Sequence, residues 1–168
     1  MRKIIADTHA HTIVSGHAYS TIREMASAAK RRGIQVQALT EHAPKMPGTC
    51  GLYYFQNLDV IPREMDGVRM LFGAELNIMD PEGNVDLPCF GEERSEDEVM
   101  RAYEAVMKKP YVKIIGHPDD SRFPTDYERL VKMAKETGTL LELNNSSLRP
   151  ASFRVGTREN LLTMLDLC

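Results

Sequence analysis

The side chains most suited to chemistry in this sequence are its five histidines and a small set of carboxylates. Imidazole nitrogens and carboxylate oxygens are ligands for zinc, manganese and iron, and a bridging carboxylate lets two cations sit close together. His9 and His11 are separated by one residue, so in an extended segment both rings point the same way and can reach one metal ion. This pattern indicates metal-assisted chemistry. The candidate metal ligands are His9, His11, His17, His42, Glu75 and His117.

These candidates must be positioned by strand-like runs that alternate with amphipathic helical segments. Such alternation is typical of βαβ units with a mostly parallel sheet, and therefore of an α/β fold. Functional residues in these folds gather at the carboxyl ends of strands, because the loops there can vary without disturbing the core. Each candidate ligand follows or ends one of the runs. The predicted strands span residues 3–6, 36–40, 68–74, 112–115 and 140–143.

Four helices are predicted between and after these strands. Two of them begin with capping boxes, Thr21-Ile22-Arg23-Glu24 and Ser95-Glu96-Asp97-Glu98. Another begins at Thr125-Asp126-Tyr127-Glu128 and stops at a glycine, and the last covers Asn160 to Cys168. The stretch from 43 to 66 is rich in proline and glycine, which predicts a functional loop or lid with a short helix.

Several residues near the predicted site also have ordinary structural interpretations. His17 lies in Ser15-Gly16-His17, which could be a plain turn, and Glu75 could be a solvated strand end. Asp7 is interpreted as a hydrogen-bond partner of a histidine ring or, almost equally, as a strand-end turn residue. A role as ordinary charged loop residues is at least as well supported for Glu41, Asp119 and Asp120.

Composition limits the classes of protein and of partner. With 168 residues, 42% hydrophobic and 27% charged, the chain is expected to form one globular domain over residues 1–168. A net charge of -3 gives no broad attraction for nucleic acid or anionic lipid. No apolar run is long enough to span a bilayer, and the first residues lack a signal-peptide core. Three widely spaced cysteines form no disulfide or zinc-knuckle pattern, which favours a reducing cytoplasm.

The motifs around the candidate ligands resemble the PHP (polymerase and histidinol phosphatase) domain family. The similarity lies in Asp7-Thr8-His9-Ala10-His11-Thr12, Ser15-Gly16-His17-Ala18-Tyr19-Ser20, Leu39-Thr40-Glu41-His42, Gly73-Ala74-Glu75 and Gly116-His117-Pro118. The "HAYST" motif and Glu142-Leu143-Asn144-Asn145-Ser146-Ser147 look most like the small stand-alone phosphatase branch of that family.

The resemblance implies a distorted seven-stranded, TIM-like (β/α) barrel that holds up to three metal ions, usually zinc, with manganese or iron as alternatives. By motif, His9 and His11 would bind the first metal with Glu75, and Glu75 would bridge to a second metal that His117 also binds. His17 and His42 would bind the third. The implied activity is hydrolysis of a small phosphorylated substrate, a phosphoric monoester, by metal-activated water.

Two parts of the family pattern are absent from this sequence. The pattern has an extra strand ending in a histidine ligand between the Glu75 and His117 strands, whereas here no histidine occurs from residue 43 to 116. The family barrel also ends with an Asp-x-His element that this chain lacks. We therefore expect a C-terminally truncated, partial barrel of about five βα units, whose exposed sheet edges invite aggregation or self-association into a homo-oligomer. A truncated gene product, an incomplete sequence and a subunit completed by another chain are the alternatives.

Three functional hypotheses follow, and a metal-dependent phosphatase is the leading one. The second is a PHP nuclease or polymerase-associated domain, which the acidic balance and the lack of a basic strip argue against. The third is a non-catalytic metal-binding remnant, which the missing ligands favour.

Overall fold

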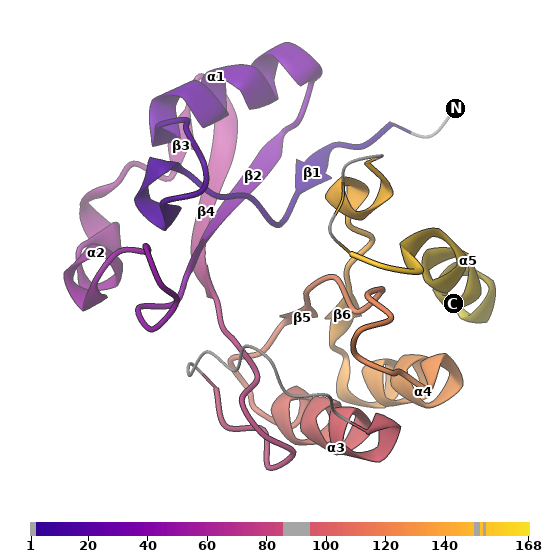
Figure 1. Cartoon of the computed structure of the whole chain (residues 1–168). Helices are drawn as coiled ribbons and strands as arrows, with labels where there is room; N and C mark the ends of the chain where they lie inside the picture. The colour runs from indigo at the N-terminus through magenta and orange to yellow at the C-terminus, as the bar shows by residue number, and fades with distance from the viewer. Residues whose placement is uncertain (1–2, 86–94, 150–151, 153) are drawn as a thin grey trace. The chain divides into compact units, whose positions relative to one another are not determined.

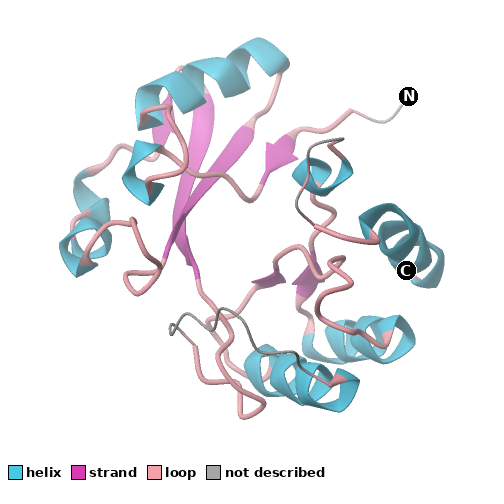
Figure 2. Ribbon diagram, viewed as in Figure 1, coloured by secondary structure: helices cyan, strands magenta, loops and turns pink. Residues whose placement is uncertain are grey.

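A computed structural model describes residues 3–85, 95–149, 152 and 154–168, and these divide into two compact units. Among the described residues, the first unit covers 3–77, and the second covers 78–85 together with the residues from 95 onward. The fold is mixed α/β, with five α-helices and mostly parallel strand pairing in the described parts (Figures 1 and 2). None of the described helices has the length and apolar character needed to cross a lipid bilayer.

The first unit is built on a four-stranded sheet in the order β1-β2-β4-β3. Strands β1, β2 and β4 are parallel, and β3 runs antiparallel to β4. The elements of this unit are β1 (Ala6–Asp7), η1 (Ile13–Ser15), α1 (Ile22–Arg32), β2 (Val36–His42), α2 (Leu52–Gln56), η2 (Leu58–Val60), β3 (Glu64–Met65) and β4 (Val68–Glu75).

The burial patterns of the two long strands, β2 and β4, match their positions in this sheet. β2 lies between two neighbours, and each of its residues is buried or half-buried, as expected for an inner parallel strand. β4 alternates at its start between buried Val68 and Met70 and exposed Arg69 and Leu71. Helix α1 supplies the apolar cover for this core. The buried core residues of the unit are Ala26, Ala29, Leu39, Val68 and Met70.

The register of β2 against β4 decides where the site begins. The seven aligned residue pairs run from Val36 and Arg69 to His42 and Glu75, so the last pair brings a histidine beside a carboxylate at the carboxyl ends of both strands. The chain after β1 stays close to β2, because the backbone N–H of Thr40 donates to the carbonyl of Ala10 at 2.8 Å. Three segments that are distant in sequence therefore converge at this edge.

The second unit contains a parallel pair of short strands, β5 and β6, and three helices around one core. Helix α3 begins with the predicted Ser95–Glu98 capping box, and Asp126 caps α4 by accepting from the N–H of Arg129. The elements are α3 (Glu96–Met107), β5 (Ile114–Ile115), α4 (Tyr127–Thr137), β6 (Leu140–Leu141), η3 (Asn145–Leu148) and α5 (Thr157–Leu167). The most deeply buried core side chains are Met100, Val106, Leu130 and Met164.

Most predicted elements are present, with shifts at their ends. The predicted strand at 3–6 is observed as Ala6–Asp7, because only these two residues pair with β2; Ile4 and Ile5 are 75% and 50% exposed. The last helix begins three residues before the predicted Asn160, and the two-residue strand β3 was not predicted. Residues 86–94 include most of the region where the sequence lacks the expected extra strand, and they lie outside the described residues. Neither sheet is closed within the part that the structure describes, and the single domain over 1–168 stays a prediction.

Candidate metal centre

One carboxylate oxygen is the focus of the first unit's histidines. Oε2 of Glu75 lies 3.1 Å from Nε2 of His9, 3.1 Å from Nε2 of His11 and 3.0 Å from Nδ1 of His42. Two ligands of the same tetrahedral zinc ion, each about 2.0–2.1 Å from it, lie roughly 3.3 Å apart. The observed spacings are close to that value, so these atoms are arranged much as ligands around a shared cation are.

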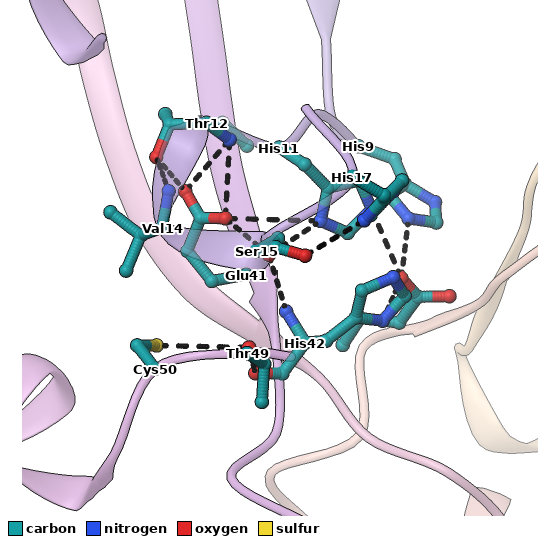
Figure 3. Close-up of polar contacts among 12 residues, drawn as sticks. His9, His11, Thr12, Val14, Ser15, His17, Glu41, His42, Thr49 and Cys50 are labelled. Atoms are coloured by element: carbon teal, nitrogen blue, oxygen red, sulfur yellow. Dashed lines mark hydrogen bonds and ion pairs between the residues drawn. The ribbon is translucent and has the colours of Figure 1, made fainter. Parts of the chain in front are cut away.

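The imidazole rings themselves form a compact group, which Figure 3 shows with His9, His11, His17 and His42 labelled. The rings of His11 and His42 stack with centroids 4.4 Å apart, and His17 lies 5.0 Å from His11 and 4.9 Å from His42. One nitrogen from each of these three rings lies within 4.8 Å of the other two. Three ring nitrogens at these distances are close enough to bind one cation.

The surroundings of His42 keep its ring neutral. Its side chain is 13% exposed, and its Nδ1 has no aligned hydrogen-bond partner among the described residues, although Glu75 is near. Burial lowers the pKa of His42 to about 4; Glu75 acts to raise it, and the three neighbouring histidines lower it further. A buried, neutral imidazole with an unsatisfied nitrogen is the form that binds a metal ion, so the donor set fits a cation.

This pKa shift predicts the pH dependence of stability in the metal-free protein. Unfolded His42 titrates near 6.5 and folded His42 near 4, so the unfolded state binds more protons between these values. The free energy of unfolding should therefore fall as the pH is lowered from 6.5 to 4, by on the order of 1–2 kcal/mol after allowance for screening by water. Urea unfolding in the presence of a chelator at several pH values, compared with His42→Gln, measures this. Equal pH slopes for the two proteins would contradict the prediction.

The loop that carries His11 and His17 is held by a buried carboxylate from β2. Glu41 is fully buried and accepts from the N–H of Thr12 at 3.0 and 3.1 Å, from the Thr12 hydroxyl at 2.6 Å and from the Ser15 hydroxyl at 2.5 Å. An ionised carboxylate requires such donors when it is removed from water. Glu41 is thus a structural centre of the site rather than a solvated loop residue.

Asp7, Thr12 and Gly16 shape the turns that lead into the histidine cluster. Asp7 accepts from the backbone N–H of His9 at 3.2 Å, as a strand-end turn residue does. Thr12 caps the short helix η1 by accepting from the N–H of Val14, and Gly16 ends it with a φ of 68°. At Gly16 a Cβ atom would lie 2.2 Å from the carbonyl oxygen of Gly48, so only glycine lets the chain pass there. Ser15-Gly16-His17 is therefore a turn, and this turn places the His17 ring beside those of His11 and His42.

His117, the sixth predicted ligand, belongs to the second unit. It follows β5, its N–H donates to Oε2 of Glu142 at 2.7 Å, and its φ is 32°. A non-glycine residue in the left-handed region is uncommon and is held there by its surroundings, often at functional positions. Nearby Asp119 and Asp120 are buried, and Asp120 pairs with Arg122. Neither aspartate is therefore an exposed loop charge.

Residue type predicts no role for Thr12 or Ser15 and allows two interpretations of Glu41. A signal was present for Glu41, since it falls in the otherwise apolar part of a central strand, where a charge needs buried donors. No comparable signal identifies Thr12 and Ser15, because hydroxyl residues are ordinary in turns.

The fold and this cluster define a mixed α/β protein with a group of histidines and a carboxylate, at the carboxyl ends of parallel strands, that could hold metal ions. Residues 7–117 match the PHP domain family, and the chain belongs to that family. The resemblance seen in the motifs is thereby confirmed.

Relatives of this chain include several proteins named as probable phosphatases. One from Thermoanaerobacter sp. is 45% identical over 94% of this chain and 71% of its own length. Another from Acetivibrio thermocellus is 43% identical over 94% of this chain and 71% of its own length. A third from Clostridium novyi is 40% identical over 99% of this chain and 74% of its own length.

Proposed function

We propose that this chain is a metal-dependent phosphoesterase that hydrolyses a small phosphorylated molecule, a phosphoric monoester. The observation that carries the proposal is the convergence of His9, His11 and His42 on one oxygen of Glu75. Membership of the PHP domain family and the names of the relatives support the general class of phosphatase. The acidic balance of the chain favours a small substrate over a nucleic acid.

The metal ions would be held by the cluster of the first unit. His9, His11 and Glu75 would form one part of the ligand set, and His17 and His42 the other, with zinc the first choice and manganese or iron as alternatives. For His117 the proposal rests on the Gly116-His117-Pro118 motif and on the strained backbone. When bound, the metals would polarise phosphoryl oxygens and lower the pKa of coordinated water.

The protein's own residues have three tasks in this proposal. The ring of His42, whose pKa burial lowers, presents a lone pair without the proton that would compete with a cation. Glu75 supplies negative charge at the point where the rings meet, which offsets the charge of the cations. Glu41 holds the loop after β1, so that His11 and His17 stay in place without a bound ion. We also expect the described parallel strands to belong to a distorted (β/α) barrel, as the family suggests.

The test is metal content by elemental analysis together with hydrolysis of a generic aryl phosphate, with and without added Zn²⁺ or Mn²⁺. Up to three bound metals with turnover is the expected result. Bound metal without turnover would favour the non-catalytic remnant. A protein that shows neither bound metal nor turnover would contradict the proposal for this chain. A single-stranded oligonucleotide as an alternative substrate tests the nuclease hypothesis, and preferential cleavage of it would replace the phosphatase.

A further inference from the structure

Ser15 lies at the centre of a hydrogen-bond network that links Glu41 to two of the histidines (Figure 3). Its side chain is almost fully buried, and its Oγ lies 2.5 Å from Oε2 of Glu41, 3.1 Å from the backbone nitrogen of His42 and 3.4 Å from Nδ1 of His11. A hydroxyl has one hydrogen to donate and two lone pairs that accept. The three contacts therefore use the whole bonding capacity of this oxygen.

The direction of the Ser15 hydrogen is fixed by Glu41. A carboxylate only accepts, and here the two oxygens receive the N–H and hydroxyl of Thr12 as well as the hydroxyl of Ser15. The backbone N–H of His42 only donates, so the Ser15 hydrogen cannot point at it. The hydrogen of Ser15 is consequently committed to Glu41, and both lone pairs of its oxygen are left to accept.

This commitment decides the tautomer of His11. Because Oγ of Ser15 can only accept from the ring, Nδ1 of His11 must carry a proton for the 3.4 Å contact to be a hydrogen bond. A neutral ring with its proton on Nδ1 has its lone pair on Nε2. That is the nitrogen that lies 3.1 Å from Oε2 of Glu75, so the two atoms are placed to bind the same cation.

His17 is held in the same tautomer by a different atom of the same residue. Its Nδ1 lies 2.9 Å from the backbone carbonyl oxygen of Ser15, which can only accept. Nδ1 of His17 therefore carries the proton, and its Nε2 is left with a lone pair. Substitution of the Ser15 side chain removes the contact to His11 and leaves the contact to His17, which makes His17 an internal control.

We propose that Ser15 and Glu41 are positioning residues that set the His11 tautomer, so that its Nε2 lone pair is ready for a metal ion before the ion binds. This inference rests on the proposed function of the cluster as a metal centre. Partners of this kind, which bond to the second nitrogen of a histidine ligand, typically change metal affinity 10- to 100-fold when removed.

The decisive variant is Ser15→Ala, because it removes one oxygen and fits the same space. In metal-free protein kept in chelator, imidazole ¹⁵N shifts from long-range ¹H–¹⁵N spectra report the tautomer of each ring. We expect the wild type to show the proton on Nδ1 of both His11 and His17. In Ser15→Ala, His11 should become a mixture while His17 stays unchanged, and zinc affinity measured with a competing chelator should fall about 10- to 100-fold.

Glu41→Gln tests the other half of the network. A glutamine side chain has one accepting oxygen, so either Thr12 or Ser15 must face its NH₂ group. If that group faces Ser15, the hydroxyl hydrogen is released towards His11 and stabilises the tautomer that cannot bind metal through Nε2. We expect the same change at His11 and again none at His17. A wild-type His11 protonated on Nε2, or a Ser15→Ala spectrum identical to the wild type, would overturn the inference.

Two comparisons distinguish an effect of Ser15→Ala on protein stability from an effect on metal binding. Val68→Ala removes buried apolar surface from the core of the same unit and so destabilises it, but it should leave both tautomers and zinc affinity unchanged. If the wild type binds neither Zn²⁺ nor Mn²⁺, the proposed function fails and this inference fails with it. If the wild type binds zinc and Ser15→Ala binds it equally well, only this inference fails.

Discussion

Replacement of His9 by alanine is expected to remove bound metal and phosphatase activity together. The ring of His9 is 14% exposed and contributes one of the nitrogens that converge on Oε2 of Glu75. Loss of this ring therefore removes a ligand from the centre of the proposed set. Metal ions contribute several kcal/mol to the stabilisation of a phosphoryl-transfer transition state, which corresponds to roughly 1,000-fold or more in rate. Elemental analysis and kcat/KM for an aryl phosphate, measured on the same preparation, check this expectation.

The matched control for His9→Ala is again Val68→Ala, which destabilises the same unit without touching a proposed ligand. It should keep its metal content and its kcat/KM at a temperature where both variants are folded. Full activity in His9→Ala would show that the ligand assignment is wrong. Loss of activity with full metal content would instead show that His9 acts on the substrate and not on the metal.

Metal removal is expected to have the second large effect, on stability as well as on activity. The ligands come from segments that lie far apart in the chain, so the unfolded chain cannot present them together. A metal that binds only the folded state stabilises it by about 4 kcal/mol at a free concentration 1,000 times its Kd. For a chain of this size, we expect a chelator to lower Tm by roughly 8–16 °C and to abolish turnover, with recovery on addition of Zn²⁺ or Mn²⁺.

Here the His9→Ala variant serves as the control, because a protein without its metal should show no change of Tm with chelator. Thermal unfolding of both proteins with and without chelator gives the comparison. A wild type that keeps its activity and its Tm after exhaustive chelation would contradict the prediction.

Local features of the fold were predictable because they depend on neighbours in the sequence. The capping boxes of α1 and α3 formed at the expected residues, since each needs only side chains three positions apart. β2 and β4 were found from their apolar runs. The first strand was placed too early, because whether Ile4 and Ile5 pair depends on how far β2 extends beside them. The residue type of Ile4 and Ile5 does not indicate where the pairing with β2 begins.

By itself, the sequence determined which atoms this protein offers to a metal ion. The histidines and Glu75 follow strand-like runs, and parallel strands place such residues at one edge. Only the tertiary structure decided that Glu41 is buried and that its partners are Thr12 and Ser15, which lie 29 and 26 positions away in the chain. The physical reason is that residue type fixes what a side chain can donate or accept. Its protonation, its tautomer and its partners depend on which distant groups the strand register brings within hydrogen-bond distance.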